Sequence, residues 1–328
     1  MSKLIRPLSV AASLILVMAT AAMTQDFPSR PIKIVVPYGP GGATDIVARL
    51  VSEEMRRTLG QPVLVENKPG ANGILAIEAV ATSKPDGYTL MLGNVTTNGV
   101  TPVIHANKLK INYEKDLTPI AKIGSLPSVL ILTTVNFEPK TLPDVVDFAK
   151  KNPGKVRYCS AGVGSYPHFD TELFAKRAGI QMTHIPVQAG AGGILNGMLN
   201  GDLQFCVLNV ASSLPMVKAG KLRALAVTGD EHLAEYPGVP TLAEAGYPGV
   251  GTTAWQALFA PGGTPKDVLH KLHNAVAKAL ASKSVKDGLE KQMFTPTPTS
   301  SPEDAKQWIE SELAHWKKIH SELNLKIE

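Results

Sequence analysis

The chain has 328 residues and a formal net charge of +5 at pH 7, with no cluster of basic residues. This mild, dispersed charge offers no basic surface for nucleic acid, which is therefore not an expected partner. The length exceeds one typical core and predicts two domains, while 28 glycines and 25 prolines against 5% aromatic residues favour many tight turns over an aromatic-rich sandwich.

Residues 1–22 have the pattern of a secretory signal peptide. Lys3 and Arg6 precede an apolar stretch at 8–18 that is too short to span a membrane, and Ala19-Thr20-Ala21 supplies small residues for cleavage. A buried first helix is the alternative. A signal peptide predicts that the mature chain folds outside the cytoplasm.

Strand and helix patterns alternate along the chain, which is typical of parallel sheets covered by helices and predicts an α/β fold. The predicted strands are residues 32–36, 63–66, 89–93, 129–133, 156–160, 182–186, 204–209, 223–228 and 254–260. The predicted helices are residues 44–58, 73–81, 142–150, 169–178, 193–200, 265–281, 284–292 and 302–323.

The first strand is followed by a glycine loop that opens the first helix, with glycines at 39, 41 and 42. Such a junction presents free backbone N–H groups and is suited to an anion. It lacks the Lys-Ser/Thr ending of a phosphate-binding P-loop and the G-x-G-x-x-G order of a dinucleotide-binding motif. Both absences disfavour a nucleotide ligand. Asp45 is expected to cap N–H groups at the helix start rather than to bind the anion. A tight turn without a ligand is the alternative.

A similar junction follows the strand at 156–160, where Gly162 and Gly164 lead into Ser165 and His168. We expect Gly164, Ser165 and His168 to donate hydrogen bonds, although His168 could instead be a packed residue of the first helical turn. A secreted hydrolase with a Ser165–His168 pair is the alternative function. It is disfavoured because the segment is not G-x-S-x-G and no acidic residue is placed to orient His168.

Neutral hydrogen-bonding residues follow other predicted strands. Asn209 precedes Ser212 and Ser213, Asn94 precedes Thr96 and Thr97, and residues 186–193 form a glycine-rich loop. The carboxyl ends of strands are the usual ligand position in α/β sheets. Charged side chains are nearly absent from these loops, so amides and helix dipoles would hold the ligand. This favours a carboxylate over a metal and argues against acid–base catalysis.

The two cysteines, Cys159 and Cys206, lie on predicted strands. If these strands are neighbours, the spacing permits a disulfide in an oxidising compartment, and two buried free thiols are the alternative. Neither cysteine has a histidine or a second cysteine at the spacing of a metal site.

The two similar junctions predict two lobes with a ligand cleft between them. The first lobe would comprise residues 26–123 plus 230–328, and the second would comprise residues 124–229. The helix at 302–323 carries an apolar stripe and is predicted to pack on the first lobe, with a partner-binding helix as the alternative.

Motifs spread over nearly the whole mature chain resemble one family, the extracytoplasmic solute receptors of tripartite tricarboxylate transporters, or Bug family. They are PIKIVVPY at 31–38, PGGATD at 40–45, VENKPGA at 65–71, PDGYTL at 85–90, KAGKLRALAV at 218–227, VPTLAEAG at 239–246 and APGGTP at 260–265. Each motif alone is weak, whereas the set is highly specific.

The resemblance implies a type II periplasmic binding protein fold without catalytic activity or cofactor. It implies a periplasmic receptor that passes a small carboxylate to membrane permease subunits, and we expect a monomer. Matched position by position, the residues expected to bind the ligand are Tyr38, Gly41, Ala43, Thr44, Asn94, Gly164, Ser165, His168, Asn209 and Ala211.

Two positions depart from the family's pattern. Val187-Gln188 replaces a frequent Tyr-Lys, and Leu208 replaces a frequent Asp. Loss of the acidic residue removes a partner for an ammonium group, so amino acids are expected to bind poorly. The predicted ligand is a dicarboxylate with an apolar middle, either aromatic such as terephthalate or aliphatic. A ligand sensor that reports to a signalling partner is the alternative to transport.

Overall fold

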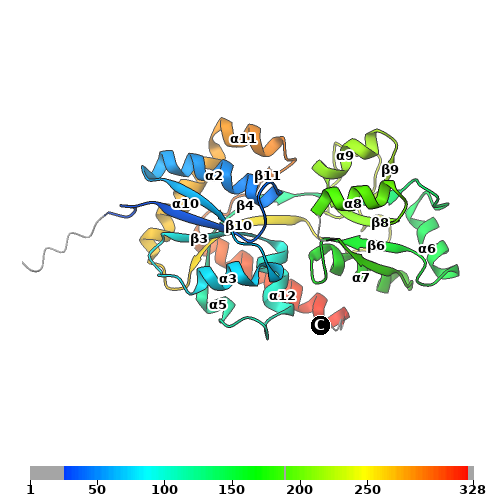
Figure 1. Cartoon of the computed structure of the whole chain (residues 1–328), viewed down its shortest axis with the longest axis horizontal. Coiled ribbons are helices and arrows are strands. Elements are labelled where there is room, and N and C mark those ends of the chain that lie inside the picture. The colour runs from blue at the N-terminus through cyan, green and yellow to red at the C-terminus, as the bar shows by residue number, and fades with distance from the viewer. Residues whose placement is uncertain (1–25, 188–189, 324–328) are drawn as a thin grey trace, which may run out of the picture.

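The computed structural model describes residues 26–187 and 190–323, which form two α/β lobes side by side (Figure 1). The predicted signal peptide lies outside the described residues. Each lobe contains one sheet with helices packed against it, so the predicted two-lobed α/β fold is confirmed. No helix in the described part of the chain is long and apolar enough to cross a bilayer.

The first lobe has a six-stranded sheet in which β1 pairs in parallel with β2 and β3, whereas β10 runs antiparallel to β3 and β4. In spatial order the strands are β11 (Thr295–Pro296), β4 (Leu117–Leu126), β10 (Ala254–Pro261), β3 (Thr89–Asn94), β1 (Ile32–Val36) and β2 (Val63–Asn67). The helices are α2 (Ala43–Leu59), η1 (Ala71–Gly73), α3 (Ile74–Ala81), η2 (Val95–Val100), α4 (Thr101–Ile104), α5 (Tyr113–Asp116), α10 (Lys266–Ala281), α11 (Lys283–Glu290) and α12 (Pro302–Leu323).

The second lobe has a five-stranded sheet in which β6 pairs in parallel with β7 and β8, whereas β5 runs antiparallel to β8 and β9. In spatial order the strands are β7 (Thr183–Pro186), β6 (Arg157–Ser160), β8 (Phe205–Asn209), β5 (Ser128–Thr133) and β9 (Leu222–Val227). The helices are α6 (Leu142–Lys151), α7 (Tyr166–Ala178), α8 (Gly190–Leu199) and α9 (Val210–Lys218).

The sheets differ from the sequence prediction in being mixed rather than parallel. The reason is that the strands next to the passages between the lobes, β4, β5 and β10, run antiparallel to their neighbours. The sequence pattern gives no strand at β4, because Thr118, Pro119 and Lys122 interrupt its apolar residues. Its main partner, β10, lies far away along the chain.

Residues 210–215, predicted as a loop, form the start of helix α9. Asn209 caps this helix, since its side-chain oxygen accepts the Ser212 amide at 2.9 Å. Pro215 lies inside the helix, where a proline normally indicates a break. This helix was therefore not predicted, because its serines and its internal proline are typical of loops, although its N-cap is well formed.

The chain passes between the lobes twice. Strand β4 leads through Pro127 into β5, and residues 228–253 return from β9 to β10. The Thr228 amide donates to the Ser128 carbonyl at 3.0 Å, which ties the two passages together. The chain thus leaves the first sheet and enters the second next to Pro127. The exact lobe limits drawn from the sequence stay predictions.

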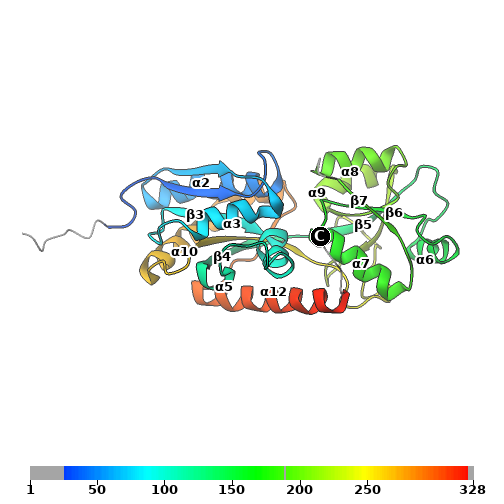
Figure 2. The same cartoon turned by 60° about the horizontal axis from the view of Figure 1, so that its bottom comes forward.

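Helix α12 connects the lobes on one side. It packs along β4 and α10 of the first lobe, and its end reaches α7 of the second lobe (Figure 2). The rings of Trp316 and Phe169 meet edge to face at 6.1 Å, and Arg177 pairs with Glu322 at 3.4 Å. The predicted packing on the first lobe is confirmed, and the contact with α7 adds a second role.

Cys159 of β6 and Cys206 of β8 form a disulfide. Their strands are parallel neighbours with these two residues in register, and the Cα atoms are 5.1 Å apart. Of the two alternatives left open by the sequence, the structure contains the bridge.

Replacing both cysteines with serine should lower the free energy of unfolding by about 4 kcal/mol, because the bridge restricts the unfolded chain across a separation of 47 residues. Denaturant unfolding with and without a thiol reductant measures this effect. Reductant should destabilise the wild type and leave the double variant unchanged. A wild type whose stability ignores the reductant would contradict the prediction.

Asp170 of α7 fixes the returning passage from inside the molecule. Its buried carboxylate accepts the Thr252 amide at 3.0 Å and the Thr252 hydroxyl at 2.7 Å. Burial raises the pKa of Asp170 to about 7, and the two hydrogen bonds only partly offset this rise. The folded protein therefore binds a proton more tightly at this carboxyl than the unfolded chain does.

This raised pKa makes stability fall as pH rises from about 4 to about 7, because the folded state keeps a proton that the unfolded state has lost. The loss amounts to about 4 kcal/mol over that window. His168, whose pKa is lowered to about 4, acts in the opposite direction. The measurement is therefore the difference in unfolding free energy between wild type and Asp170→Asn. The wild type should lose stability relative to the variant as pH rises. A difference that stays constant with pH would contradict the prediction.

Candidate functional site

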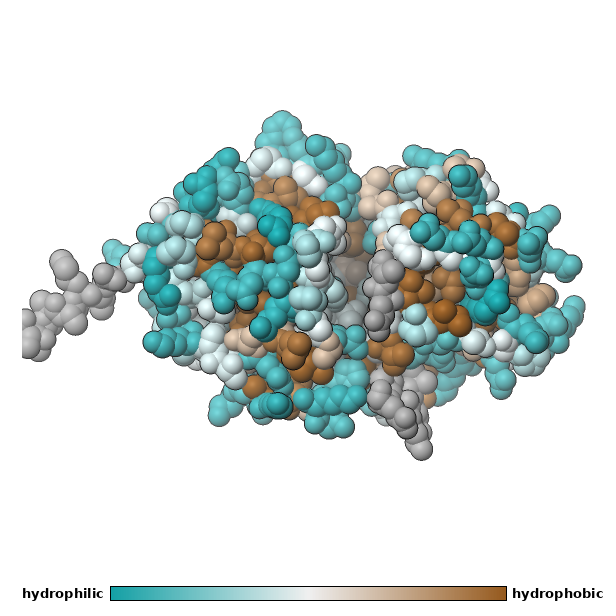
Figure 3. All heavy atoms as spheres, in the orientation of Figure 1, coloured by the Kyte–Doolittle hydropathy of each residue, from teal (hydrophilic) through white to brown (hydrophobic). Residues whose placement is uncertain are grey.

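A cleft of about 620 Å³ lies between the two lobes, and the space-filling view shows the surface hollowed there (Figure 3). The first lobe lines it with Pro37, Tyr38, Gly39, Pro69, Gly70, Ala71, Asn72, Gly73, Ile74, His105 and Lys108. The second lobe lines it with Ala161, Gly162, Val163 and Pro186. Among these residues there is no aspartate or glutamate, so the described wall carries no negative charge.

The first glycine loop is held in shape by the buried carboxylate of Asp45. This carboxylate accepts the Gly41 amide at 2.9 Å, the Arg49 guanidinium at 3.0 and 2.9 Å, and the Asn67 side-chain amide at 2.9 Å. Burial alone would raise the pKa of Asp45, but these hydrogen bonds outweigh it and lower the pKa. Asp45 therefore accepts an amide of the loop before the helix rather than the first-turn amides that it was expected to cap, and the Gly41 amide is not free.

Helix α2 begins beside this loop without a side-chain cap. Gly42 is the N-cap residue and supplies no side chain, so the amides of Ala43 and Thr44 in the first turn have no partner within the helix. The positive end of the helix dipole lies at the same point. These two amides are therefore available to an anion.

Tyr38 links this helix start to the cleft wall. Its hydroxyl donates to the Asn94 side-chain oxygen at 3.0 Å, and the Asn94 amide group donates to the Thr44 hydroxyl at 3.4 Å. Asn94 also caps η2 by accepting the Thr97 amide at 3.1 Å. Burial raises the pKa of Tyr38 far above its usual value, so the phenol stays neutral. Asn94 thus positions Tyr38 and Thr44.

The second loop is satisfied by its own residues. The Gly164 amide donates to His168 Nδ1 at 3.2 Å, and both the amide and the hydroxyl of Ser165 donate to the Gly162 carbonyl, at 3.2 and 2.8 Å. The Tyr166 amide donates to the Thr96 hydroxyl of the first lobe at 3.4 Å. The donors expected to meet a ligand at Gly164 and Ser165 are therefore already engaged here.

His168 packs against a second histidine. Its ring stacks on His184 with centroids 4.1 Å apart, and His184 Nε2 lies 2.7 Å from the Ser160 hydroxyl. Burial, and then the neighbouring His184, lower the pKa of His168 to about 4. Because Nδ1 accepts the Gly164 amide, the proton of this neutral ring is on Nε2. The packed first-turn alternative for His168 fits this geometry.

Asn209 and Ala211, which follow strand β8, lie at the start of α9. The Asn209 side-chain oxygen is used as the cap, whereas the Ala211 amide is in the first turn and has no partner within the helix. Leu208, just before the loop, is buried in the apolar cluster of the second lobe. No carboxylate is therefore presented at that position.

Comparison with known proteins identifies the family. Residues 47–325 match the model of the tripartite tricarboxylate transporter family receptor. The chain belongs to this receptor family. A UPF0065 protein of Bordetella pertussis is 35% identical over 317 residues, which cover 96% of each chain. The family prediction made from the sequence is confirmed.

Two solved structures have a similar fold. MatC from Rhodopseudomonas palustris with bound malate is 33% identical, with a TM-score of 0.78 over 89% of this chain and 99% of that one. Rpa4515 of R. palustris with adipate is 30% identical, with a TM-score of 0.81 over 91% of this chain and 99% of that one.

Members of this family are periplasmic solute-binding receptors rather than enzymes, and the receptor is not a hydrolase. The geometry agrees, since the Ser165 hydroxyl is bonded to the Gly162 carbonyl and not to His168. Among the described residues there is also no cluster of His, Cys, Asp and Glu suited to a metal ion.

Of the ten residues expected to bind the ligand, Tyr38 lines the cleft. Thr44 and Asn94 are connected to Tyr38 through hydrogen bonds. Gly164, Ser165 and His168 follow the segment 161–163 that lines the opposite wall, whereas Gly41, Ala43, Asn209 and Ala211 are not among the lining residues. Asn72, His105 and Lys108 of the first-lobe wall were not predicted from the sequence. The only sequence signal near them is the family motif at 65–71, which ends one residue before Asn72.

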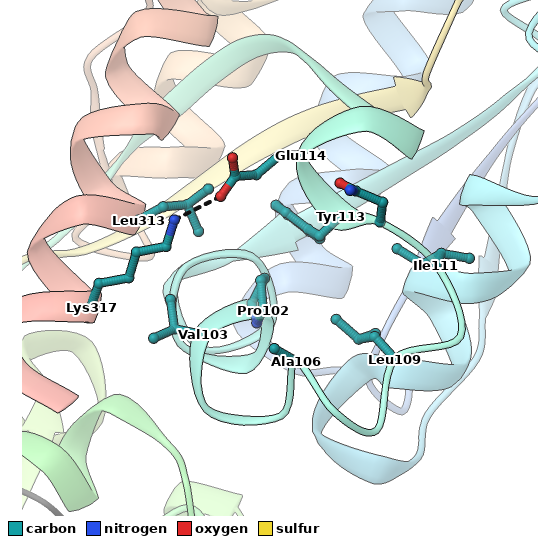
Figure 4. A pocket seen from close by; sticks show the side chains of 10 residues that line it. Pro102, Val103, Ala106, Leu109, Ile111, Tyr113, Glu114, Leu313 and Lys317 are labelled. Carbon is teal, nitrogen blue, oxygen red and sulfur yellow. Dashed lines mark hydrogen bonds and ion pairs between the residues drawn. The ribbon is translucent and has the colours of Figure 1, made fainter. Parts of the chain in front are cut away.

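The receptor has a second hollow, of about 390 Å³, on the first lobe (Figure 4). Its walls come from the α4 region, α5 and α12, and are mainly apolar, with Val103, Leu109 and Leu313 among them. Lys317 pairs with Glu114 at 2.8 Å across its rim, so its cation is already compensated. A single lobe forms this hollow, and none of the predicted site residues lines it.

Proposed function

We propose that the receptor captures a small dicarboxylate in the cleft between its lobes and delivers it to the membrane subunits of a tripartite transporter. The observation that carries this proposal is the start of α2, where the Ala43 and Thr44 amides are unpaired and Thr44 is linked through Asn94 to Tyr38, which lines a cleft free of acidic residues. Family members solved with malate and with adipate support a dicarboxylate.

The middle of the ligand is proposed to be apolar. Tyr38, Ile74, Val163 and Pro186 provide apolar surface in the cleft, and Leu208 leaves no carboxylate to pair with an ammonium group. An aliphatic diacid such as adipate or an aromatic one such as terephthalate meets these conditions, whereas an amino acid does not. Gln188, the other departure from the family's pattern, lies outside the described residues.

We also propose that residues 1–22 are a cleaved signal peptide and that the mature receptor acts as a monomer in the periplasm. The disulfide supports an oxidising compartment. The membership of the family supports a permease partner rather than a signalling one.

Isothermal titration of the mature protein with aspartate, succinate, adipate and terephthalate tests the ligand class. We expect adipate or terephthalate to bind most tightly and aspartate to bind most weakly, because the cleft offers no partner for its ammonium group. Tight binding of aspartate would contradict the apolar-middle proposal. Binding of none of the four would contradict the dicarboxylate proposal.

Replacing Ala43 with proline tests the backbone amide directly. Ala43 is the first residue of α2 and follows Gly42 in an extended conformation (φ −78°, ψ 165°), a position where proline is tolerated. Ala43→Pro removes one N–H group and should weaken dicarboxylate binding by about 1.5–3 kcal/mol. Ala43→Ser keeps the amide and is the matched control. Equal affinities of the two variants, with unchanged circular dichroism, would remove this amide from the site.

A further inference from the structure

Three polar residues form one wall of the cleft, and none of them lies in a loop that the sequence predicted to bind the ligand. Asn72 belongs to η1, while His105 and Lys108 follow α4. They line the same cleft as Tyr38 and Gly39, which precede α2. We infer that this wall binds the second carboxylate of the ligand, with Lys108 as the cation that selects a dianion over a monoanion.

The charge of the wall supports an anion. The Lys108 ammonium forms no ion pair with any described carboxylate, and no acidic residue lines the cleft. By contrast, the cations of Arg49 and Lys317 are compensated by Asp45 and Glu114. An unpaired ammonium in a concave wall without acids attracts an anion more strongly than one on an open surface.

His105 adds an unsatisfied buried polar group to the same wall. Its side chain is 5% exposed, and its Nδ1 has no hydrogen-bond partner among the described residues. A buried ring nitrogen without a partner costs free energy unless a ligand or water completes it. Burial, and then the nearby Lys108, lower the pKa of His105, so the ring is neutral and Lys108 supplies the charge.

Contacts within the first lobe and with the second lobe hold this wall in place. The Asn72 side-chain amide donates to the Val163 carbonyl at 2.9 Å, and the Thr101 hydroxyl donates to the Asn72 carbonyl at 2.9 Å. A Cβ on Gly164, whose φ is +81°, would lie 3.3 Å from His105 Nε2 and 2.8 Å from Ile104. Only glycine lets the second lobe approach so closely, and the wall is therefore pre-organised when the lobes are together.

The inference rests on the proposed function, since a second carboxylate requires a dicarboxylate ligand. Its test compares diacids with monoacids of the same shape, using adipate against hexanoate and terephthalate against p-toluate. Lys108→Met removes the charge and keeps the length of the side chain. Lys110→Met is the matched control, because Lys110 is also exposed in the same segment but does not line the cleft.

We expect Lys108→Met to weaken diacid binding about fivefold, to leave monoacid binding unchanged and so to reduce the preference for the diacid. Lys110→Met should behave as the wild type with all four compounds. A diacid preference that survives Lys108→Met, or an equal loss for diacid and monoacid, would overturn the inference while leaving the proposed function intact. A wild type that binds neither diacid would overturn both.

Discussion

The loop that the first lobe contributes to the cleft depends on one buried carboxylate. Asp45 neutralises Arg49, accepts the Gly41 amide and joins the loop to β2 through Asn67, whose amide also donates to the Tyr38 carbonyl. An acidic residue in the first turn of α2 would otherwise oppose an anion at that helix start. Because its charge is matched by Arg49 and its oxygens are fully used, it shapes the loop without occupying the amides of the first turn.

The two lobes use similar sequence junctions in different ways. In the first lobe the glycine N-cap of α2 has no side chain, so first-turn amides stay free. In the second lobe His168 and the Gly162 carbonyl occupy the polar groups of Gly164 and Ser165. A glycine loop before a helix therefore indicates an anion site only when the nearby side chains and carbonyls leave its donors unpaired. The second lobe contributes mainly shape, through Gly162, Val163 and Pro186.

Local patterns in the sequence were sufficient for most of the fold. The strand at 32–36 and the helix after the glycine loop both depend on neighbouring residues, and each was predictable. Strand β4 was not, because pairing with the distant β10 stabilises it despite Pro119 and Lys122. The wall that contains Asn72, His105 and Lys108 was missed for the same reason. It forms where η1 and the segment after α4 meet the second lobe, and no spacing within either segment indicates that contact.

The contacts between the lobes differ in strength on the two sides of the molecule. At the cleft, single hydrogen bonds join them, from Asn72 to Val163 and from Tyr166 to Thr96. Away from it, α7 is held by the buried Asp170–Thr252 pair and by the rings of Phe169 and Trp316. Each hydrogen bond at the cleft is worth about 1 kcal/mol, so the observed arrangement of the lobes gains little from these two bonds alone. A ligand that contacted both walls would add to the stability of this arrangement, while α7 and α12 hold the lobes together away from the cleft.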